Sequence, residues 1–194
     1  MKFFKLLIML AVFPMSMFAQ INTERVMAIG RNALYFEDYV LSIQYFNQVI
    51  NAKPYLYEPY FFRGLAKLNL DDFQGAESDC SQSIERNPFV VSSYQVRGLA
   101  RINLDDYAGA ISDYEKALKY DPENVGIWHN LALCKMQQKD WKGAITDLGS
   151  LLKVSPKYTK AFLLRGQIYL EQKDTLKAEA DYNQAISMDP YDGD

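Results

Sequence analysis

The sequence predicts an all-α solenoid made of five copies of one structural unit. Five prolines recur at steps of 34 residues, namely Pro54, Pro88, Pro122, Pro156 and Pro190. Five aspartates keep the same step, namely Asp38, Asp72, Asp106, Asp140 and Asp174. Repetition at a fixed period of this length is typical of solenoids, in which a unit cannot bury its apolar face alone and stacks on its neighbours.

Residues 1–19 precede the repeats and have the features of a secretory signal peptide. Lys2 and Lys5 come before an apolar run, and Ala19 offers a small residue at a cleavage point. A retained membrane anchor is the alternative, but a spanning helix needs about 20 apolar residues, and Pro14 interrupts this stretch early. We therefore expect an exported protein, periplasmic or secreted, with no stable membrane insertion after signal cleavage.

The charge pattern argues against a nucleic-acid partner. The formal net charge is -3, and loss of the two leader lysines leaves 19 basic residues against 24 acidic ones. Basic and acidic side chains are interleaved along the repeat region, without the basic stripe that follows a phosphate backbone. Cys80 and Cys134 are separated by two helices of the stack, roughly 25 Å, which is too far for a disulfide. Both are predicted to be small buried hydrophobes.

Alignment on the prolines divides the chain into five units of 34 residues, after a short lead-in at 20–22 and before a tail at 193–194. The predicted units are 23–56, 57–90, 91–124, 125–158 and 159–192.

Each unit resembles a tetratricopeptide repeat, and the resemblance covers nearly the whole chain after the leader. The family pattern places a bulky residue at position 4 of the unit and a small one at position 8. Position 4 holds Val26, Tyr60, Tyr94, Trp128 and Phe162, and position 8 holds Gly30, Gly64, Gly98, Ala132 and Gly166. The two positions share one face of the first helix, so two helices can approach closely there. The resemblance implies a right-handed superhelix of five helix-turn-helix units.

The second helix of each unit has its own start, packing and stop signals. The aspartate at position 16 precedes it and can accept hydrogen bonds from free backbone N–H groups. Position 17 is aromatic in four units, with Thr175 as the exception, and position 20 is small: Ser42, Ala76, Ala110, Ala144 and Ala178. The proline at position 32 cannot continue a helix, because it lacks an N–H group and clashes with the preceding turn.

A charged pair recurs within the units. Position 7 holds arginine and position 23 holds aspartate in three units, giving the pairs Arg63 with Asp79, Arg97 with Asp113, and Arg165 with Asp181. We interpret them as structural ion pairs between helices or between neighbouring units. The fourth unit keeps Asp147 but has Leu131 at position 7, and the first unit has Ile29 and Tyr45.

In this family the first helices of successive units line a concave groove, and positions 2, 5, 9, 12 and 13 face into it. Positions 5, 9 and 13 of this sequence give the predicted peptide-binding residues: Met27, Arg31, Tyr35, Phe61, Leu65, Asn69, Gln95, Leu99, Asn103, His129, Leu133, Gln137, Leu163 and Gln167. The Lys and Asn clamp with which family members hold the terminal carboxylate of chaperone tails is absent from positions 5 and 9. An amphipathic helix or an extended apolar peptide is therefore the expected ligand.

The sequence predicts no enzyme and no cofactor or metal site. Catalysis needs a nucleophile, or an acid and a base, held together in a pocket. The chain has a single histidine, His129, with no glycine-rich phosphate loop and no metal-ligand spacing. Cys134 and Asp140 lie five and eleven residues from His129, at offsets that do not assemble a triad. We interpret His129 as a groove or surface residue.

The function expected from these features is that of a non-catalytic scaffold that binds a protein or peptide in its groove, within a bacterial envelope assembly. Two alternatives stay open. The chain could be the sensory or docking module of a longer signalling or enzymatic protein continuing past Asp194. It could also be a structural solenoid that self-associates through an uncapped C-terminal repeat, where Tyr182, Ala185 and Ile186 are expected to be partly exposed.

Overall fold

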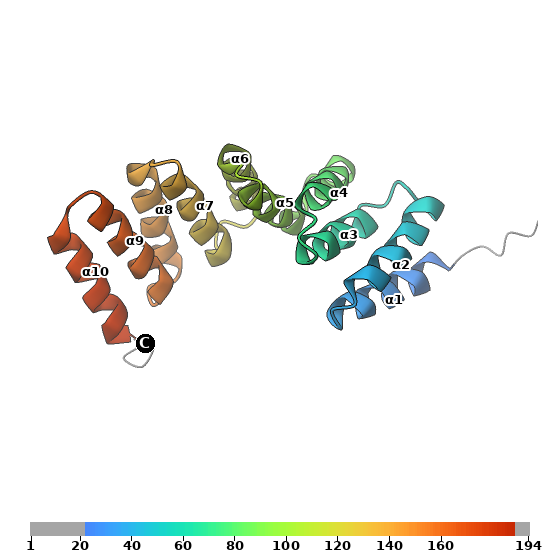
Figure 1. Ribbon diagram of the computed structural model, residues 1–194, viewed down its shortest axis with the longest axis horizontal. Helices are drawn as coiled ribbons and strands as arrows, with labels where there is room; N and C mark the ends of the chain where they lie inside the picture. Colours follow the sequence, from blue (N-terminus) through green and yellow to red (C-terminus); the bar gives the residue numbers. More distant parts are fainter. Residues whose placement is uncertain (1–21, 189–194) are drawn as a thin grey trace, which may run out of the picture.

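The computed structural model describes residues 22–188, which form ten α-helices and no strand. Figure 1 shows them as five successive helix pairs. The helices are α1 (Thr23–Tyr35), α2 (Tyr39–Ala52), α3 (Glu58–Asn69), α4 (Phe73–Arg86), α5 (Val91–Asn103), α6 (Tyr107–Leu118), α7 (Val125–Gln137), α8 (Trp141–Val154), α9 (Thr159–Glu171) and α10 (Thr175–Met188). The predicted all-α solenoid is confirmed. The predicted leader, the lead-in at 20–21, Pro190 and the tail lie outside the described residues.

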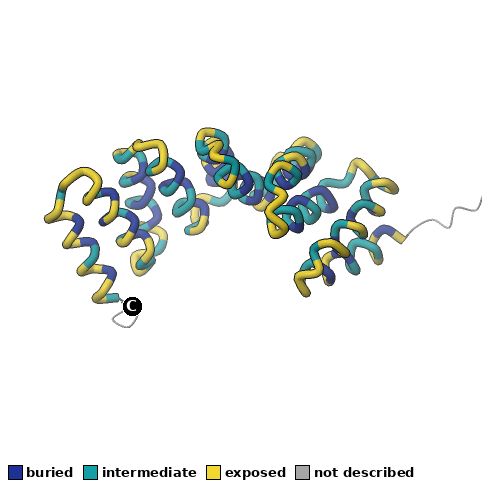
Figure 2. The backbone as a smooth tube through the Cα atoms, viewed as in Figure 1, coloured by how far each residue is buried: buried dark blue, intermediate teal, exposed yellow. Residues whose placement is uncertain are grey.

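The ten helices form an arch with an inner and an outer layer. Each helix packs against the next one in the chain, and α3 also contacts α1 and α5, as α9 contacts α7. Figure 1 shows α3 and α5 on the lower, concave side of the arch, with α4 and α6 above them. Buried residues follow the lines where neighbouring helices face each other (Figure 2). No helix within 22–188 has the length and apolarity to cross a membrane.

The repeated aspartates cap the second helices, as predicted. Asp72 Oδ1 accepts a hydrogen bond from the Gly75 N–H group at 2.9 Å, and Asp106 does the same for Gly109. The equivalent bonds recur at Asp38, Asp140 and Asp174. A feature absent from the prediction precedes every cap, where a non-glycine residue has a positive φ of about 60°: Glu37, Asp71, Asp105, Lys139 and Lys173. This left-handed residue ends each first helix and reverses the chain.

Glycine at position 8 allows close approach of the two helices of a unit. A Cβ atom at Gly98 would lie 2.7 Å from the ring of Tyr114 on α6, and one at Gly64 would lie 2.9 Å from the sulfur of Cys80 on α4. Both distances are shorter than any ordinary contact, so a side chain at either position would push the helices apart. Cys80 and Cys134 are free and fully buried, as predicted, and burial raises the pKa of each thiol to about 12.

The predicted arginine–aspartate pairs are confirmed and lie within single units. Arg97 donates from Nε and Nη2 to the two oxygens of Asp113 at 2.9 and 2.6 Å, and Arg165 binds Asp181 in the same two-pronged way. Arg63 and Asp79 form the third such pair. The aspartates are almost fully buried, which is tolerated because two hydrogen bonds satisfy each carboxylate.

A second cation, at position 11, was missed by the sequence reasoning. Arg101 donates to Asp113 at 2.9 Å, so two guanidinium groups hold that carboxylate, and Lys67 adds a second cation to Asp79. In the fourth unit Lys135 takes the place of the absent arginine, at 2.7 Å from Asp147. Asp147 thus has one close cation where Asp113 has two. Burial raises the pKa of Asp147, although the hydrogen bond from Lys135 opposes that shift.

Candidate functional site

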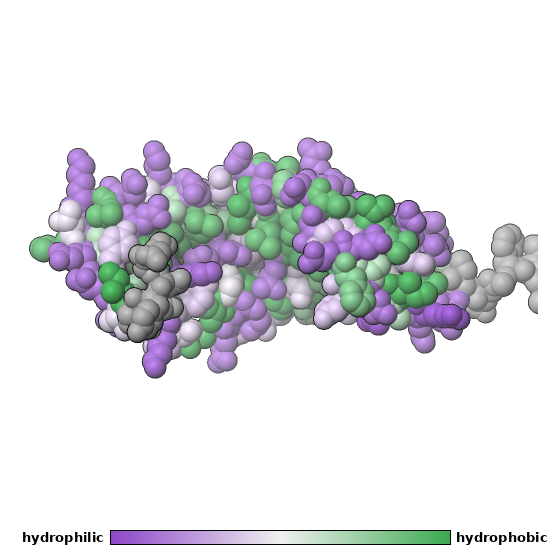
Figure 3. Space-filling model, turned by 60° about the horizontal axis from the view of Figure 1, so that its bottom comes forward, coloured by the Kyte–Doolittle hydropathy of each residue, from purple (hydrophilic) through white to green (hydrophobic). Residues whose placement is uncertain are grey.

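The candidate site is the concave face, which we define as the surface formed by α1, α3, α5, α7 and α9. Figure 3 turns the lower side of the arch forward and shows hydrophobic residues along the middle of the molecule, between hydrophilic residues at the edges. These five helices lie on one side because the first helix of each unit packs between the second helix of its own unit and that of the unit before.

All fourteen predicted groove residues are accessible to solvent. Seven are exposed: Arg31, Tyr35, Asn69, Asn103, Gln137, Leu163 and Gln167. Seven are half-buried: Met27, Phe61, Leu65, Gln95, Leu99, His129 and Leu133. Their spacing of four residues puts the members of each unit on one stripe of its first helix, and the stacking of units aligns the stripes. Leu133 also packs against the core cluster around Leu148 and Leu151, so its role is partly structural.

The centre of the concave face is apolar and its edge is polar. Leu65 and Leu99 occupy the same place on adjacent helices, with Phe61 one turn before Leu65. At the edge, the side-chain amides of Asn69 and Asn103 donate to the carbonyl oxygens of Leu65 and Leu99 at 2.8 and 2.9 Å. These bonds fix the amides against their own helices. A ligand on this surface would therefore meet aliphatic side chains flanked by oriented amides.

Each end of the concave face has a hollow. The N-terminal one, about 330 Å³, is lined by residues that include Met27, Arg31, Lys53 and Glu58, and so mixes both signs of charge with apolar surface. The C-terminal hollow is about 240 Å³ and lies between α7 and α9, where six side chains line it: Met136, Gln137, Lys139, Trp141, Gln167 and Glu171. Two of the predicted groove residues, Gln137 on α7 and Gln167 on α9, line this second hollow.

His129 lies on α7, the first helix of the fourth unit. Its ring packs edge-on against Tyr158, with centroids 5.8 Å apart, and the buried Nδ1 atom has no hydrogen-bond partner within the described residues. Burial lowers the pKa of His129, and the positive charge of Lys160 lowers it further. The imidazole is therefore neutral near pH 7. No acid or nucleophile is paired with it in the part of the chain that is described, and no group of side chains there could hold a metal ion.

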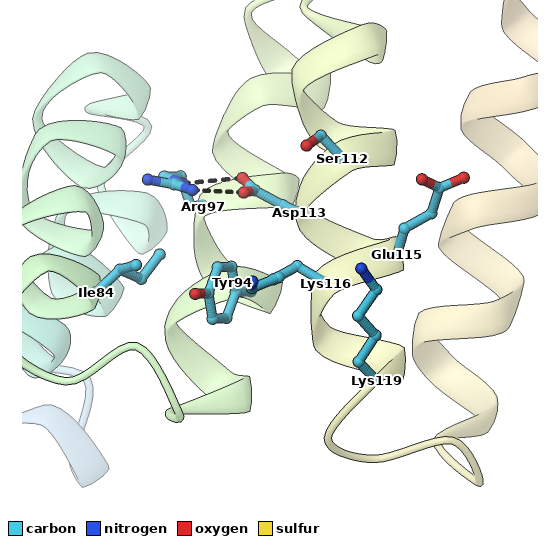
Figure 4. A pocket seen from close by; sticks show the side chains of 8 residues that line it. All are labelled: Ile84, Tyr94, Arg97, Ser112, Asp113, Glu115, Lys116 and Lys119. Carbon is cyan, nitrogen blue, oxygen red and sulfur yellow. Dashed lines mark hydrogen bonds and ion pairs between the residues drawn. The ribbon is translucent and has the colours of Figure 1, made fainter.

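A further cavity, of about 320 Å³, lies between α4, α5 and α6 rather than on the groove stripes. Figure 4 shows Arg97 paired with Asp113 in its lining, with Lys116 extending from α6 and Lys119 just after the end of that helix. Arg97 and Asp113 already satisfy each other's charge, so we interpret the cavity as space beside a structural ion pair. At the end of α1, Tyr35 and Phe36 are 80% and 77% exposed, with rings 5.2 Å apart.

The C-terminal face of α10 differs in part from the expectation. Ile186 is 60% exposed and Tyr182 is half-buried, as expected, but Ala185 is buried. Ile84 and Leu152 hold the same repeat position as Ile186, and both are partly buried against clusters that include residues of the following unit.

Comparison with known proteins agrees with the repeat pattern. Residues 102–168 and 159–192 match the tetratricopeptide repeat family. Among solved structures, MamA superposes with a TM-score of 0.82 and 17% identity, over 87% of this chain and 92% of that chain. MamA from Desulfovibrio magneticus RS-1, residues 41 to the end, gives 0.83 and 15%, over 89% and 97%.

A third similar structure is YrrB, described as a TPR protein with an unusual peptide-binding site. It superposes with a TM-score of 0.77 and 11% identity, over 86% of each chain. A sequence search of curated proteins gave no significant match. At these identities the superpositions establish the fold.

Proposed function

We propose that this chain, a tetratricopeptide-repeat protein, is a non-catalytic scaffold that binds an apolar segment of a partner polypeptide on its concave face. The observation that carries the proposal is the apolar stripe of Phe61, Leu65 and Leu99, which is half-buried, so that each residue keeps part of its surface accessible to solvent. An apolar stripe with oriented amides at its edge suits a helix or strand that is apolar on one side.

The description of one protein with a similar fold is consistent with this proposal. YrrB is described as having a peptide-binding site. In the present chain the concave face combines aliphatic residues with the amides of Asn69, Asn103 and Gln137, which can hydrogen-bond to a peptide backbone. The excess of acidic over basic residues favours a partner that is neutral or basic around its apolar segment.

We also propose where in the cell the protein acts. The basic and then apolar leader at residues 1–19 supports export, so we propose that the scaffold acts in an envelope assembly, periplasmic or secreted. Fractionation of cells producing the full chain with a C-terminal epitope tag would test this, because export predicts tagged protein outside the cytoplasm, shortened by the length of the leader. Full-length protein confined to the cytoplasm would contradict it.

The binding proposal is tested by selecting peptides from a displayed random library on the immobilised full chain, then measuring their affinities by fluorescence anisotropy. A groove variant carries Leu65→Glu and Leu99→Glu. A matched control carries Ser78→Glu and Ser112→Glu, two exposed positions on the second helices α4 and α6. We expect the groove variant to bind about 100-fold more weakly, as for loss of a central apolar anchor, and the control to bind like the wild type.

Circular dichroism of both variants shows whether they remain helical. Equal binding by the wild type and by a folded groove variant would overturn the proposal, as would a loss of binding only in the control.

A specific observation favours one other candidate, self-association through α10. Leu176 and Ile186 on this helix are 79% and 60% exposed, and exposed apolar side chains of this size favour association. Light scattering would then show a molar mass that rises with concentration and falls to that of a monomer in Ile186→Glu. A constant monomer mass would contradict it.

A further inference from the structure

We propose that the fifth unit, defined here as residues 159–188 with α9 and α10, is a hinged module whose position sets the width of the C-terminal end of the groove. The inference starts from the polar ties that join each unit to the one before it. Two ties recur along the molecule, and both are missing at the junction between α8 and α9.

The first tie is a hydrogen bond from the ring at position 4 to the carbonyl oxygen of the preceding proline. Tyr60 donates to Pro54 at 3.2 Å, and Tyr94 donates to Pro88 at 3.0 Å. Trp128 makes the same contact with Pro122 through Nε1 at 2.8 Å. In the fifth unit the residue is Phe162, whose ring has no donor. The start of α9 is therefore not bound to the end of the fourth unit in this way.

The second tie joins the position 7 arginine to position 25 of the preceding unit. Arg63 donates from Nη1 to Asn47 at 2.5 Å, and Arg97 donates to Ser81 at 3.0 Å. The fourth unit has a longer substitute, Lys135 at 3.8 Å from Glu115. Arg165 of the fifth unit binds only Asp181 of its own unit among the described residues, because the residue at position 25 of the fourth unit is Gly149.

Gly149 also leaves space at this junction. A Cβ atom built on it would meet nothing within 4 Å, and α8 and α9 pack more sparsely than the other helices that join adjacent units. Within residues 125–188 no side-chain hydrogen bond or ion pair crosses from the fourth unit to the fifth. The contact that remains is apolar, through Leu148, Leu151 and Leu164 among others. Apolar contact is non-directional, so it holds the unit without fixing its angle.

The consequence for the groove follows from where the hollow between α7 and α9 lies. Gln137 is on the fourth unit and Gln167 is on the fifth, so a rotation at the junction changes the separation of the two amides. This last step rests on the proposed function, since it assumes that a ligand occupies the concave face. The hinge itself does not, and it is tested without a ligand.

The test is a pair of distance distributions measured by electron paramagnetic resonance between nitroxide labels. One pair, Thr146→Cys with Ala180→Cys, spans the junction, and the control pair, Ser78→Cys with Ser112→Cys, occupies the same positions two units earlier. All four sites are exposed, and the native Cys80 and Cys134 are buried. We expect the distribution across the junction to be about twofold broader than the control, as for a hinge between rigid bodies.

The second arm restores both ties with Phe162→Tyr and Gly149→Asn in one protein, and uses Gly149→Ala as the matched control. The restored protein is expected to give a distribution as narrow as the control pair, whereas Gly149→Ala leaves it broad. Amide hydrogen exchange separates hinge motion from unfolding, because a hinged unit keeps α9 and α10 protected.

Three results would overturn the proposal. Equal widths for the two label pairs would show that no hinge exists. A broad distribution that persists in the restored protein would show that the missing ties are not its cause. Rapid exchange throughout α9 and α10 would show that the unit unfolds rather than moves.

Discussion

The junction between the second and third units and that between the fourth and fifth units use the same repeat but differ in how they are held. At the first, Ser83 and Ser93 share a buried hydrogen bond of 2.9 Å, and Arg101 donates to Glu77 across the boundary at 2.9 Å. At the second, Leu151 and Ala161 occupy the positions of the two serines. The comparison teaches that the apolar repeat pattern sets the fold, while side chains outside that pattern set how firmly adjacent units are joined.

The largest loss of stability is expected when the charged centre of the third unit is disrupted. Asp113→Ala leaves the half-buried guanidinium group of Arg97 without its carboxylate and takes one of two carboxylates from Arg101, which keeps Glu77, and should lower the free energy of unfolding by about 3 kcal/mol. Urea denaturation followed by circular dichroism measures it. Asp147→Ala is the comparison, and its cost should be smaller because only Lys135 loses its close partner. Equal losses would mean that the second cation contributes nothing.

A smaller loss is expected from added volume inside a unit. Gly98→Ala places a Cβ atom 2.7 Å from the ring of Tyr114, and overpacking of this kind costs about 1 to 3 kcal/mol. Thermal unfolding would report it as a lower melting temperature. If the melting temperature were unchanged, α5 and α6 would have to separate without cost, which would contradict the close packing described above.

At the junction between α8 and α9, a glycine-to-alanine substitution is expected to raise the stability of the protein rather than lower it. Gly149→Ala replaces a glycine in the middle of α8, where the new methyl group meets nothing within 4 Å, so the gain in helix propensity should stabilise the protein by about 0.8 to 1 kcal/mol. Calorimetry of this variant and of Gly98→Ala would measure the expected gain and the expected loss of stability side by side. A destabilised Gly149→Ala protein would show that α8 and α9 approach more closely than the structure indicates.

The smallest change in stability is expected from one added hydrogen bond at the junction between α8 and α9. Phe162→Tyr supplies the donor that Tyr60, Tyr94 and Trp128 use to bind the preceding proline, and one such hydrogen bond should add about 0.5 to 1 kcal/mol. Hydrogen exchange of the α9 amides would slow accordingly. Exchange as fast as in the wild type would mean that the hydroxyl group does not reach the Pro156 carbonyl oxygen.

Part of the candidate site was predictable and part was not. The family resemblance predicted the stripes at positions 5, 9 and 13, and the structure leaves all fourteen residues accessible, while their part in peptide binding stays a prediction. The resemblance could not show that Leu133 packs partly into the core, nor how strongly Tyr35 and Phe36 are exposed at the end of α1. Exposure of a helical side chain depends on the distance and angle to the next helix, which one helix pattern does not contain.

The sequence by itself determined the repeat length, the helix starts at the aspartates and the three arginine–aspartate pairs, because these depend on local capping chemistry and on a period that every unit shares. Tertiary structure alone decided that the cation at position 11 of the unit reaches Asp113 and Asp147. It also decided that Gly149 faces open space while Gly98 does not. Such contacts join residues of different helices, and their distances are fixed only when the helices have packed.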